Sequence, residues 1–250
     1  MTLVVGAVGA FLACAVGGLV GFASSLLLLP VLLFLGVPLW EAVGLNLTLA
    51  VLTRLPSLIA LRASVNLRRT GLMVLGSVPG IALGLGIGGL VPVAGLEVAA
   101  GVLVLASGAF LALAPAPSEA YAAVRHRSVL LAGGCAGVLG VTTSLNGVPP
   151  AVLLARTGEQ VRTRLADLSA FFIVGNCLTM AAIAMTRDLP LLQGSVTTTT
   201  WIAAGIAGNA VGVWGAGRIG EGAFSRLTIW LVLASGCGSL VSAAIKLATG

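Results

Sequence analysis

A cluster of polar and helix-breaking residues interrupts one of the most apolar stretches of this chain. Residues 130–141 are typical of a membrane helix, and the interruption that follows consists of Thr142, Thr143, Ser144, Asn146, Gly147 and the pair Pro149–Pro150. Irregular backbone is tolerated within a bilayer only where protein or a water-filled cavity covers it. A helix that begins after such a break presents unpaired backbone N–H groups, which favour anions. We therefore interpret this break as half of a substrate site.

The composition of the chain places this break in a membrane. Hydrophobic residues make up 58% of the 250 residues and charged residues 8%, and the mean hydropathy is +1.15. Soluble domains contain roughly 25% charged residues. The length allows about ten membrane segments of ~20 residues each. The net charge of +6 comes mostly from arginines in short loops. These follow the positive-inside bias and indicate no nucleic-acid partner.

The first half of the sequence predicts five helical segments, of which one is too short to span. They cover approximately residues 3–22, 26–36, 40–61, 71–90 and 94–113. At 1.5 Å per residue, residues 26–36 cannot cross a core of ~30 Å upright. This segment is therefore expected to be a half-helix or a strongly tilted helix. It follows a second break, at Ser24 and Ser25.

The second half of the sequence resembles the first. A proline-containing linker, residues 115–127, is the clearest boundary in the chain, and the hexapeptide Leu231–Gly236 is identical to Leu103–Gly108. Spaced glycines recur in both halves and indicate helix-packing faces. We therefore predict one repeat over residues 1–114 and another over residues 128–250. Each repeat is expected to contain broken or half-helices.

The arginines predict how the two halves are oriented. With five segments in each half, ten of the 13 basic residues fall in loops on one side, whether the first two segments span separately or form a re-entrant pair. This side is the cytoplasm by the positive-inside rule, and both termini are then periplasmic. An odd number of segments makes the second repeat inverted. The predicted fold is thus an all-α polytopic membrane protein with two inverted repeats, an arrangement typical of transporters.

Short motifs in both halves resemble the sulfite exporter TauE/SafE family of membrane permeases. They are Gly17-Gly18-x-x-Gly21, Pro30, Gly36-x-Pro38 and Glu41-Ala42 in the first half, and Asn146-Gly147-x-Pro149-Pro150, Arg164 and Phe171-Phe172 in the second. The resemblance implies a bacterial inner-membrane protein that moves sulfite, sulfonates or other small sulfur-containing anions. The family's first break is usually a glycine cluster, whereas this chain has Ser24 and Ser25 there. This difference bears on the substrate more than on the fold.

The candidate substrate ligands come from the two breaks and, for Arg54, from the segment over residues 40–61. These are Ser24, Ser25, Thr143, Ser144, Asn146, Gly147 and Arg54, and the candidate gating or coupling residues are Asp167, Arg164 and Asn46. Hydroxyls, amides and helix starts are neutral donors that can hold an anion and still release it. The alternative interpretation of both breaks is simple helix ends, since serines also bond back to their own helix.

Arg54 is a charged residue within a predicted membrane segment, so it requires either a partner or a side chain that extends to the membrane surface. An arginine near the centre of a membrane helix costs roughly 2.5–3.5 kcal/mol on insertion scales. It lies about 10 Å from the cytoplasmic end of its segment. Snorkelling to that face is one explanation. A salt bridge to Asp167, on the corresponding segment of the second half, is the explanation that we predict. Asp167 has the alternative of pairing with Arg162 or Arg164.

The sequence offers no assembled catalytic or metal site. Its cysteines, Cys14, Cys135, Cys177 and Cys237, stand singly, and His126 is the one histidine and lies in a loop. We therefore expect no enzyme, cofactor or metal. The function predicted is a permease for a small anion in contact with membrane lipid. An anion channel or a scaffold subunit is the alternative. Coupling to a proton or a sodium ion, and assembly as a homo-oligomer, stay open.

Overall fold

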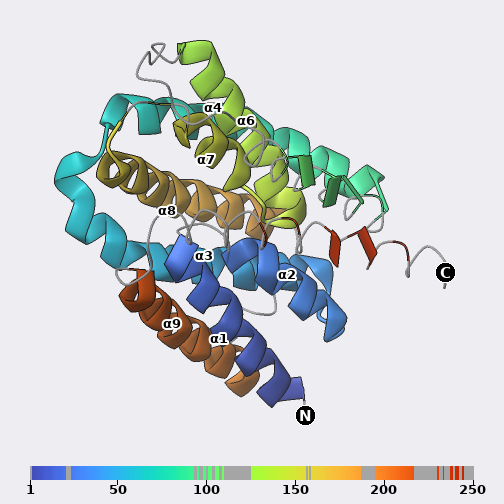
Figure 1. The fold of residues 1–250 in the computed structure, drawn as a ribbon. Coiled ribbons are helices and arrows are strands. Elements are labelled where there is room, and N and C mark those ends of the chain that lie inside the picture. The colour runs from blue at the N-terminus through green and yellow to red at the C-terminus, as the bar shows by residue number, and fades with distance from the viewer. Residues whose placement is uncertain are drawn as a thin grey trace.

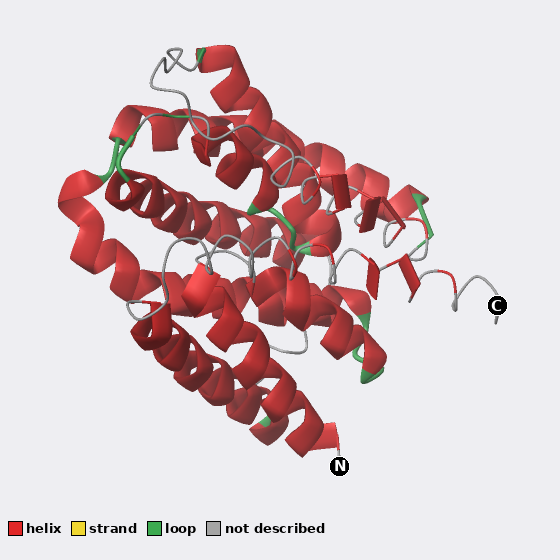
Figure 2. Cartoon of the chain, in the orientation of Figure 1, coloured by secondary structure: helices red, strands yellow, loops and turns green. Residues whose placement is uncertain are grey.

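The described part of the protein is built from helices. The computed structural model describes residues 2–20, 24–92, 125–155, 157, 159–186 and 195–216, with isolated positions between 95 and 109 and between 230 and 244. The helices are α1 (Thr2–Val20), α2 (Ser24–Phe34), α3 (Leu39–Leu61), the 3-10 turn η1 (Arg62–Ser64), α4 (Leu67–Leu90), α6 (His126–Thr143), α7 (Val148–Ala155), α8 (Val161–Thr186) and α9 (Val196–Ala216). Figure 2 shows helices and loops, with no strand among the described residues.

Several of these helices are long and apolar enough to cross a bilayer. Within the described residues the spans are Thr2–Leu19, Leu39–Ser64, Leu67–Leu90 and Arg162–Thr186. The prediction of an all-α, multi-pass membrane protein is therefore confirmed. Most of the predicted linker, residues 115–124, lies outside the described part of the chain, as does most of the fifth segment. α6 begins at His126, just inside the predicted end of that linker.

The outer helices pair across the two halves of the sequence. α1 packs along α9, and α4 packs along α6. In Figure 1 the first pair lies at the bottom and the second at the top, with α2, α3, α7 and α8 between them. The first helix of each half thus packs against the fourth helix of the other half. Two related halves would produce this reciprocal exchange. The inverted relation of the repeats stays a prediction.

Glycines make these pairs close. A Cβ atom at Gly80 would overlap the carbonyl group of Gly134, and one at Gly212 would overlap the carbonyl group of Ala15. Neither helix could approach its partner so closely with a larger side chain. The spaced glycines of α4 and α9 therefore serve helix packing, as the sequence predicts.

The two short helices begin where the sequence breaks. α2 has 11 residues and α7 has 8. α2 ends in a glycine-capped turn, in which Gly36 has a φ of 79° and the Val37 N–H donates to the carbonyl of Leu32 over 3.0 Å. Glycine adopts this left-handed conformation without steric cost. The predicted half-helix over residues 26–36 is thus present, two residues earlier than expected.

Candidate functional site

Asn46 of α3 joins the two breaks. Its amide nitrogen donates to the carbonyl oxygen of Ser25 over 3.0 Å and to the hydroxyl oxygen of Ser144 over 2.7 Å. Ser25 lies at the start of α2, and Ser144 lies between α6 and α7. Only 1% of Asn46 is exposed. One buried amide therefore holds two breaks from opposite halves of the chain against each other.

The second break is a sharply turned helix end. Ser144 has a φ of 53°, the left-handed conformation, and its N–H donates to the carbonyl of Gly140 over 3.1 Å. Its hydroxyl donates to the carbonyl of Thr143 over 2.7 Å while accepting from Asn46. The Thr143 hydroxyl bonds to Leu139 of its own helix. Each of these polar groups is buried and satisfied, which explains how the break is tolerated.

A pair of amides extends the break toward α8. The Asn146 amide nitrogen donates to the side-chain oxygen of Asn176, and both residues are buried. The amide nitrogen of Asn176 has no hydrogen-bond partner within the described structure. Gly140 lies against Asn146 and Thr179, since a Cβ placed there would be 3.2 Å from the Asn146 Cβ and 3.5 Å from the Thr179 hydroxyl. The break, α6 and α8 therefore meet at these amides.

Asn176 and Thr179 are absent from the residues predicted from the sequence. The available signal was a polar side chain in the otherwise apolar run that follows Phe171. Intramembrane polar residues generally face the protein interior, and both residues do. The residues that we predict on α8 are Arg164 and Asp167, both near its beginning.

Arg54 caps the helix that ends at the first break. Its guanidinium donates to the carbonyl oxygen of Gly17 over 3.3 Å and lies 5.9 Å from the ring centre of Phe172. α1 ends at Val20, so the carbonyl groups of its last turn have no partner within the helix. They also carry the negative end of the helix dipole. This end and the aromatic ring stabilise a cation that is only 6% exposed and does not snorkel.

The predicted salt bridge between Arg54 and Asp167 is wrong. Asp167 accepts a hydrogen bond from Nε of Arg69 over 2.6 Å and another from the backbone N–H of Asn66 over 2.7 Å. No ion pair joins it to Arg54, Arg162 or Arg164 in the described structure. The physical reason lies in the packing. The first turn of α4 lies beside the first turns of α8. Arg69, and not Arg54, is therefore within hydrogen-bond distance of Asp167.

Glu159 completes this ion-pair network. It accepts two hydrogen bonds from Arg69, of 2.7 and 2.9 Å. These bonds hold the pKa of Glu159 below its usual value, against the opposing effect of partial burial. The Arg69 network therefore ties the start of α4 to α8 and to the connection that precedes it.

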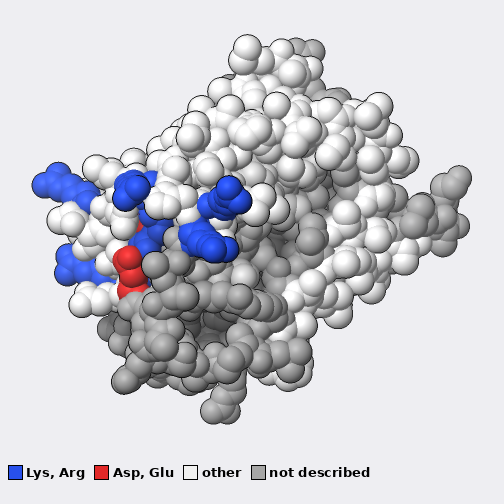
Figure 3. Space-filling view, turned by 90° about the horizontal axis from the view of Figure 1, so that it is seen from above, with Lys and Arg blue, Asp and Glu red and all other residues white. Residues whose placement is uncertain are grey.

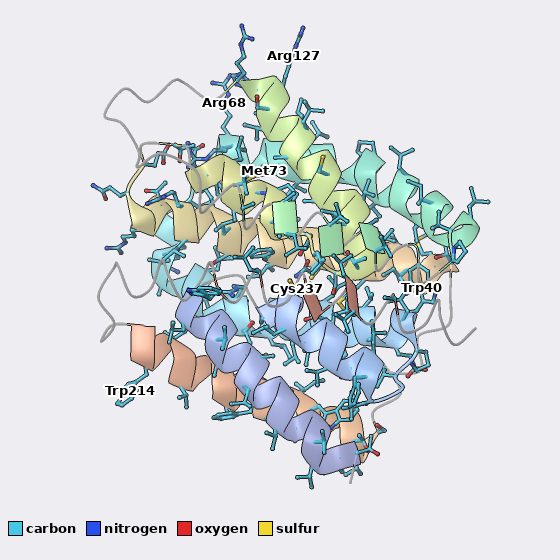
Figure 4. All side chains as sticks on the ribbon, turned by 45° about the vertical axis from the view of Figure 1, so that its right-hand side comes forward. Trp40, Arg68, Met73, Arg127, Trp214 and Cys237 are labelled. Atoms are coloured by element: carbon cyan, nitrogen blue, oxygen red, sulfur yellow. The ribbon has the colours of Figure 1, made fainter. Side chains whose placement is uncertain are left out.

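The Arg69 network lies among the arginine-rich loops. The loop between α3 and α4 and the beginning of α8 lie at the left of Figure 1, whereas the N terminus lies at the lower right. On the face drawn in Figure 3, the basic side chains gather toward one side around an acidic group. Figure 4 places Arg68 and Arg127 toward its upper edge. Arg164 is half-buried there, and its Nε has no hydrogen-bond partner among the described residues.

The predicted site residues thus separate into two groups. Around the breaks the structure brings together Ser24, Ser25, Asn46, Arg54, Thr143, Ser144, Asn146 and Gly147. Ser24 lies against Gly17, and Gly147 accepts the first hydrogen bond of α7, from Ala151. Asp167 belongs to the Arg69 network instead, and Arg164 lies near it on α8. In the described part of the chain no cluster of three His, Cys, Asp or Glu residues could hold a metal.

Comparison with known families agrees with this architecture. A family model described as sulfite exporter TauE/SafE matches residues 6–238. The chain belongs to the sulfite exporter TauE/SafE family. No curated protein and no solved structure matches it. Membership makes this TauE/SafE protein a multi-pass membrane permease of an anion-exporter family.

Proposed function

We propose that this TauE/SafE protein is a secondary carrier for a small sulfur-containing anion, sulfite or a short organosulfonate. The anion would bind where the two breaks meet. The observation that carries the proposal is the contact of Asn46 with both Ser25 and Ser144. This contact joins the start of α2 and the turn that precedes α7, which come from opposite halves of the chain, through one buried amide. Transporters with broken helices commonly bind substrate at such a position.

The chemistry of the breaks suits an anion. Their side chains are hydroxyls and amides, and the first N–H groups of α2 have no partner within that helix. At the start of α7 only the N–H of Val148 is left over, because Pro149 and Pro150 carry none and Ala151 donates to Gly147. Arg54 adds a positive charge beside the first break. Neutral donors backed by one cation can attract an anion without holding it permanently.

The proposed function includes a location and an orientation in the membrane. The protein is proposed to lie in the inner membrane of a bacterium, with the Arg69 network on the cytoplasmic side and both termini in the periplasm. The network would then close or open the cytoplasmic approach to the breaks. A proton or a sodium ion is proposed as the coupling ion.

Reconstitution into liposomes tests the proposed function. Vesicles that contain the purified protein and unlabelled sulfite should take up labelled sulfite faster than vesicles loaded with buffer, because a carrier exchanges substrate. A channel would conduct the anion without this acceleration, and a scaffold would give no flux. Either result would contradict a carrier.

Variants locate the activity within the protein. Asn46→Ala and Asn146→Ala should each slow sulfite uptake. Ser77→Ala is the matched control, because Ser77 is also buried but its hydroxyl bonds within its own helix. Ser25 contacts Asn46 through its backbone carbonyl, so the Ser25→Ala variant should keep that bond. Uptake that is equal in all the variants would place the anion away from the breaks.

A further inference from the structure

Among the described residues the amide nitrogen of Asn176 is a buried donor without a partner. Asn176 is 0% exposed, and the other end of its side chain is held by Asn146. A buried donor that has lost water and gained no acceptor is unfavourable, so native structures rarely keep one without a reason. At a substrate site, the missing acceptor is naturally supplied by the ligand.

The position of Asn176 connects this donor to the breaks. Through Asn146 it contacts the second break, between α6 and α7. On α8 it lies one turn beyond Phe172, the ring that faces Arg54. Residues four apart on a helix share a face, with their Cβ atoms ~6 Å apart. Asn176 therefore contacts the polar second break and lies one helical turn from the ring that faces the buried cation.

The buried charges decide what kind of anion fits. Among the described residues the buried charged side chains are Arg54, Arg69 and Asp167. Arg69 pairs with Asp167 and with the partly exposed Glu159, whereas no carboxylate lies within 4.0 Å of Arg54 in this part of the structure. Arg54 is thus a buried cation offset only by a helix end and an aromatic ring. Because burying uncompensated charge is costly, a ligand with one negative charge balances the interior. A dianion would leave it negative.

We propose that Asn176 is a ligand of the transported anion, and that the anion bound is singly charged. The expected species are hydrogensulfite and alkylsulfonates, with sulfate excluded. The amide N–H of Asn176 would donate to an anion oxygen while Asn146 fixes the orientation of the amide. This inference rests on the proposed carrier function and specifies its substrate.

The charge requirement is tested on the wild-type protein. Calorimetric titration of the purified protein with methanesulfonate and with sulfate should show binding of methanesulfonate at least about tenfold tighter, a difference of 1.4 kcal/mol. Equal affinity for the two anions, or a preference for sulfate, would overturn the single-charge assignment.

Two substitutions test the role of Asn176. Asn176→Leu removes the donor and should weaken methanesulfonate binding about tenfold. Asn176→Asp keeps the acceptor for Asn146 and places a carboxylate where the free amide was. It should lose binding at pH 8 and regain it as the pH falls, because a protonated carboxyl group donates a hydrogen bond. Methanesulfonate keeps its charge over this range, so its own titration adds nothing.

The controls separate this inference from the carrier proposal. Ser77→Ala should bind methanesulfonate as the wild type does, since its hydroxyl lies at a packing helix. If Asn176→Leu does not fold, Asn176→Asp and the wild-type comparison still decide the matter. Unchanged binding by either Asn176 variant at pH 8 would overturn the role of Asn176. Wild-type vesicles that exchange sulfite alongside that result would leave the carrier function standing, and vesicles that exchange none would overturn both.

Discussion

The amide nitrogen of Asn46 lies 2.7 Å from the hydroxyl oxygen of Ser144, although 98 residues separate them in the chain. Ser144 also adopts a left-handed backbone conformation, with a φ of 53°. One residue thus ends α6, turns the chain into α7 and receives the contact from the first half. Its side chain and its backbone can be tested separately.

Ser144→Ala and Ser144→Gly should differ in stability. Both variants lose the hydroxyl and its two hydrogen bonds. Glycine adopts the left-handed conformation freely, whereas alanine pays for it, so the glycine variant should be more stable by about 1 kcal/mol. Thermal unfolding in detergent measures the difference. An alanine variant as stable as the glycine variant would contradict the left-handed turn.

Asp167 should be coupled to Arg69 in a double-mutant cycle. Arg69→Ala should destabilise the protein strongly, by about 3–5 kcal/mol, because it leaves the buried carboxylate of Asp167 without its cation. Asp167→Ala should destabilise it less, because Arg69 keeps its ion pair with Glu159. The double variant should lose much less than the sum. Arg68→Ala, an exposed neighbour, is the control. Stronger coupling of Asp167 to Arg54 than to Arg69 would restore the pairing that the sequence suggests.

Glu159 should give the Arg69 network a dependence on pH. Its pKa is lowered in the folded protein from the usual 4.5 by hydrogen bonds from Arg69. A carboxyl group whose pKa is lower in the folded than in the unfolded protein stabilises the fold fully at a pH above its unfolded pKa. This stabilisation is lost as the pH falls through its folded pKa. The stability advantage of the wild type over Glu159→Gln should therefore shrink below pH 4.5. Thermal unfolding from pH 7 to pH 3 tests this, and an advantage that grows toward acid would contradict it.

Two glycines of α4 should respond in opposite directions to alanine. At Gly80 a Cβ would overlap the backbone of Gly134, whereas at Gly86 nothing lies within 4 Å. Gly80→Ala should destabilise the protein by about 1–3 kcal/mol through overpacking. Gly86→Ala should be neutral or stabilise the helix by up to about 1 kcal/mol. Equal unfolding temperatures for the two variants would mean that α4 and α6 are not in close contact.

The predicted orientation in the membrane can be tested with single cysteines. Cysteines at positions 68 and 127, both exposed in the structure, should be protected from an impermeant thiol reagent in intact cells. A cysteine at position 2 should be labelled. All four native cysteines must first be replaced, because three of them are exposed. Labelling at position 68 would overturn the assignment of the arginine-rich loops to the cytoplasm.

The sequence by itself determined the class of protein and the position of its breaks. Long apolar runs require helices in a bilayer, because their backbone groups must be satisfied within the segment. The same rule makes residues 24–25 and 142–150 stand out, since polar and helix-breaking residues cannot continue such a helix. The motifs around these breaks pointed to the TauE/SafE family, which the family match confirms.

The tertiary structure decided which polar groups meet. Asp167 and Arg54 each needed a partner, but sequence separation says nothing about whether Arg69 or Arg54 comes nearer to Asp167. The packing of α4 beside α8 places Arg69 there, and the open end of α1 satisfies Arg54 in place of a carboxylate. The amide nitrogen of Asn176, which has no partner among the described residues, is likewise a result of packing. Periodicity describes one helix at a time, whereas charge pairing and unsatisfied donors depend on the neighbours that packing supplies.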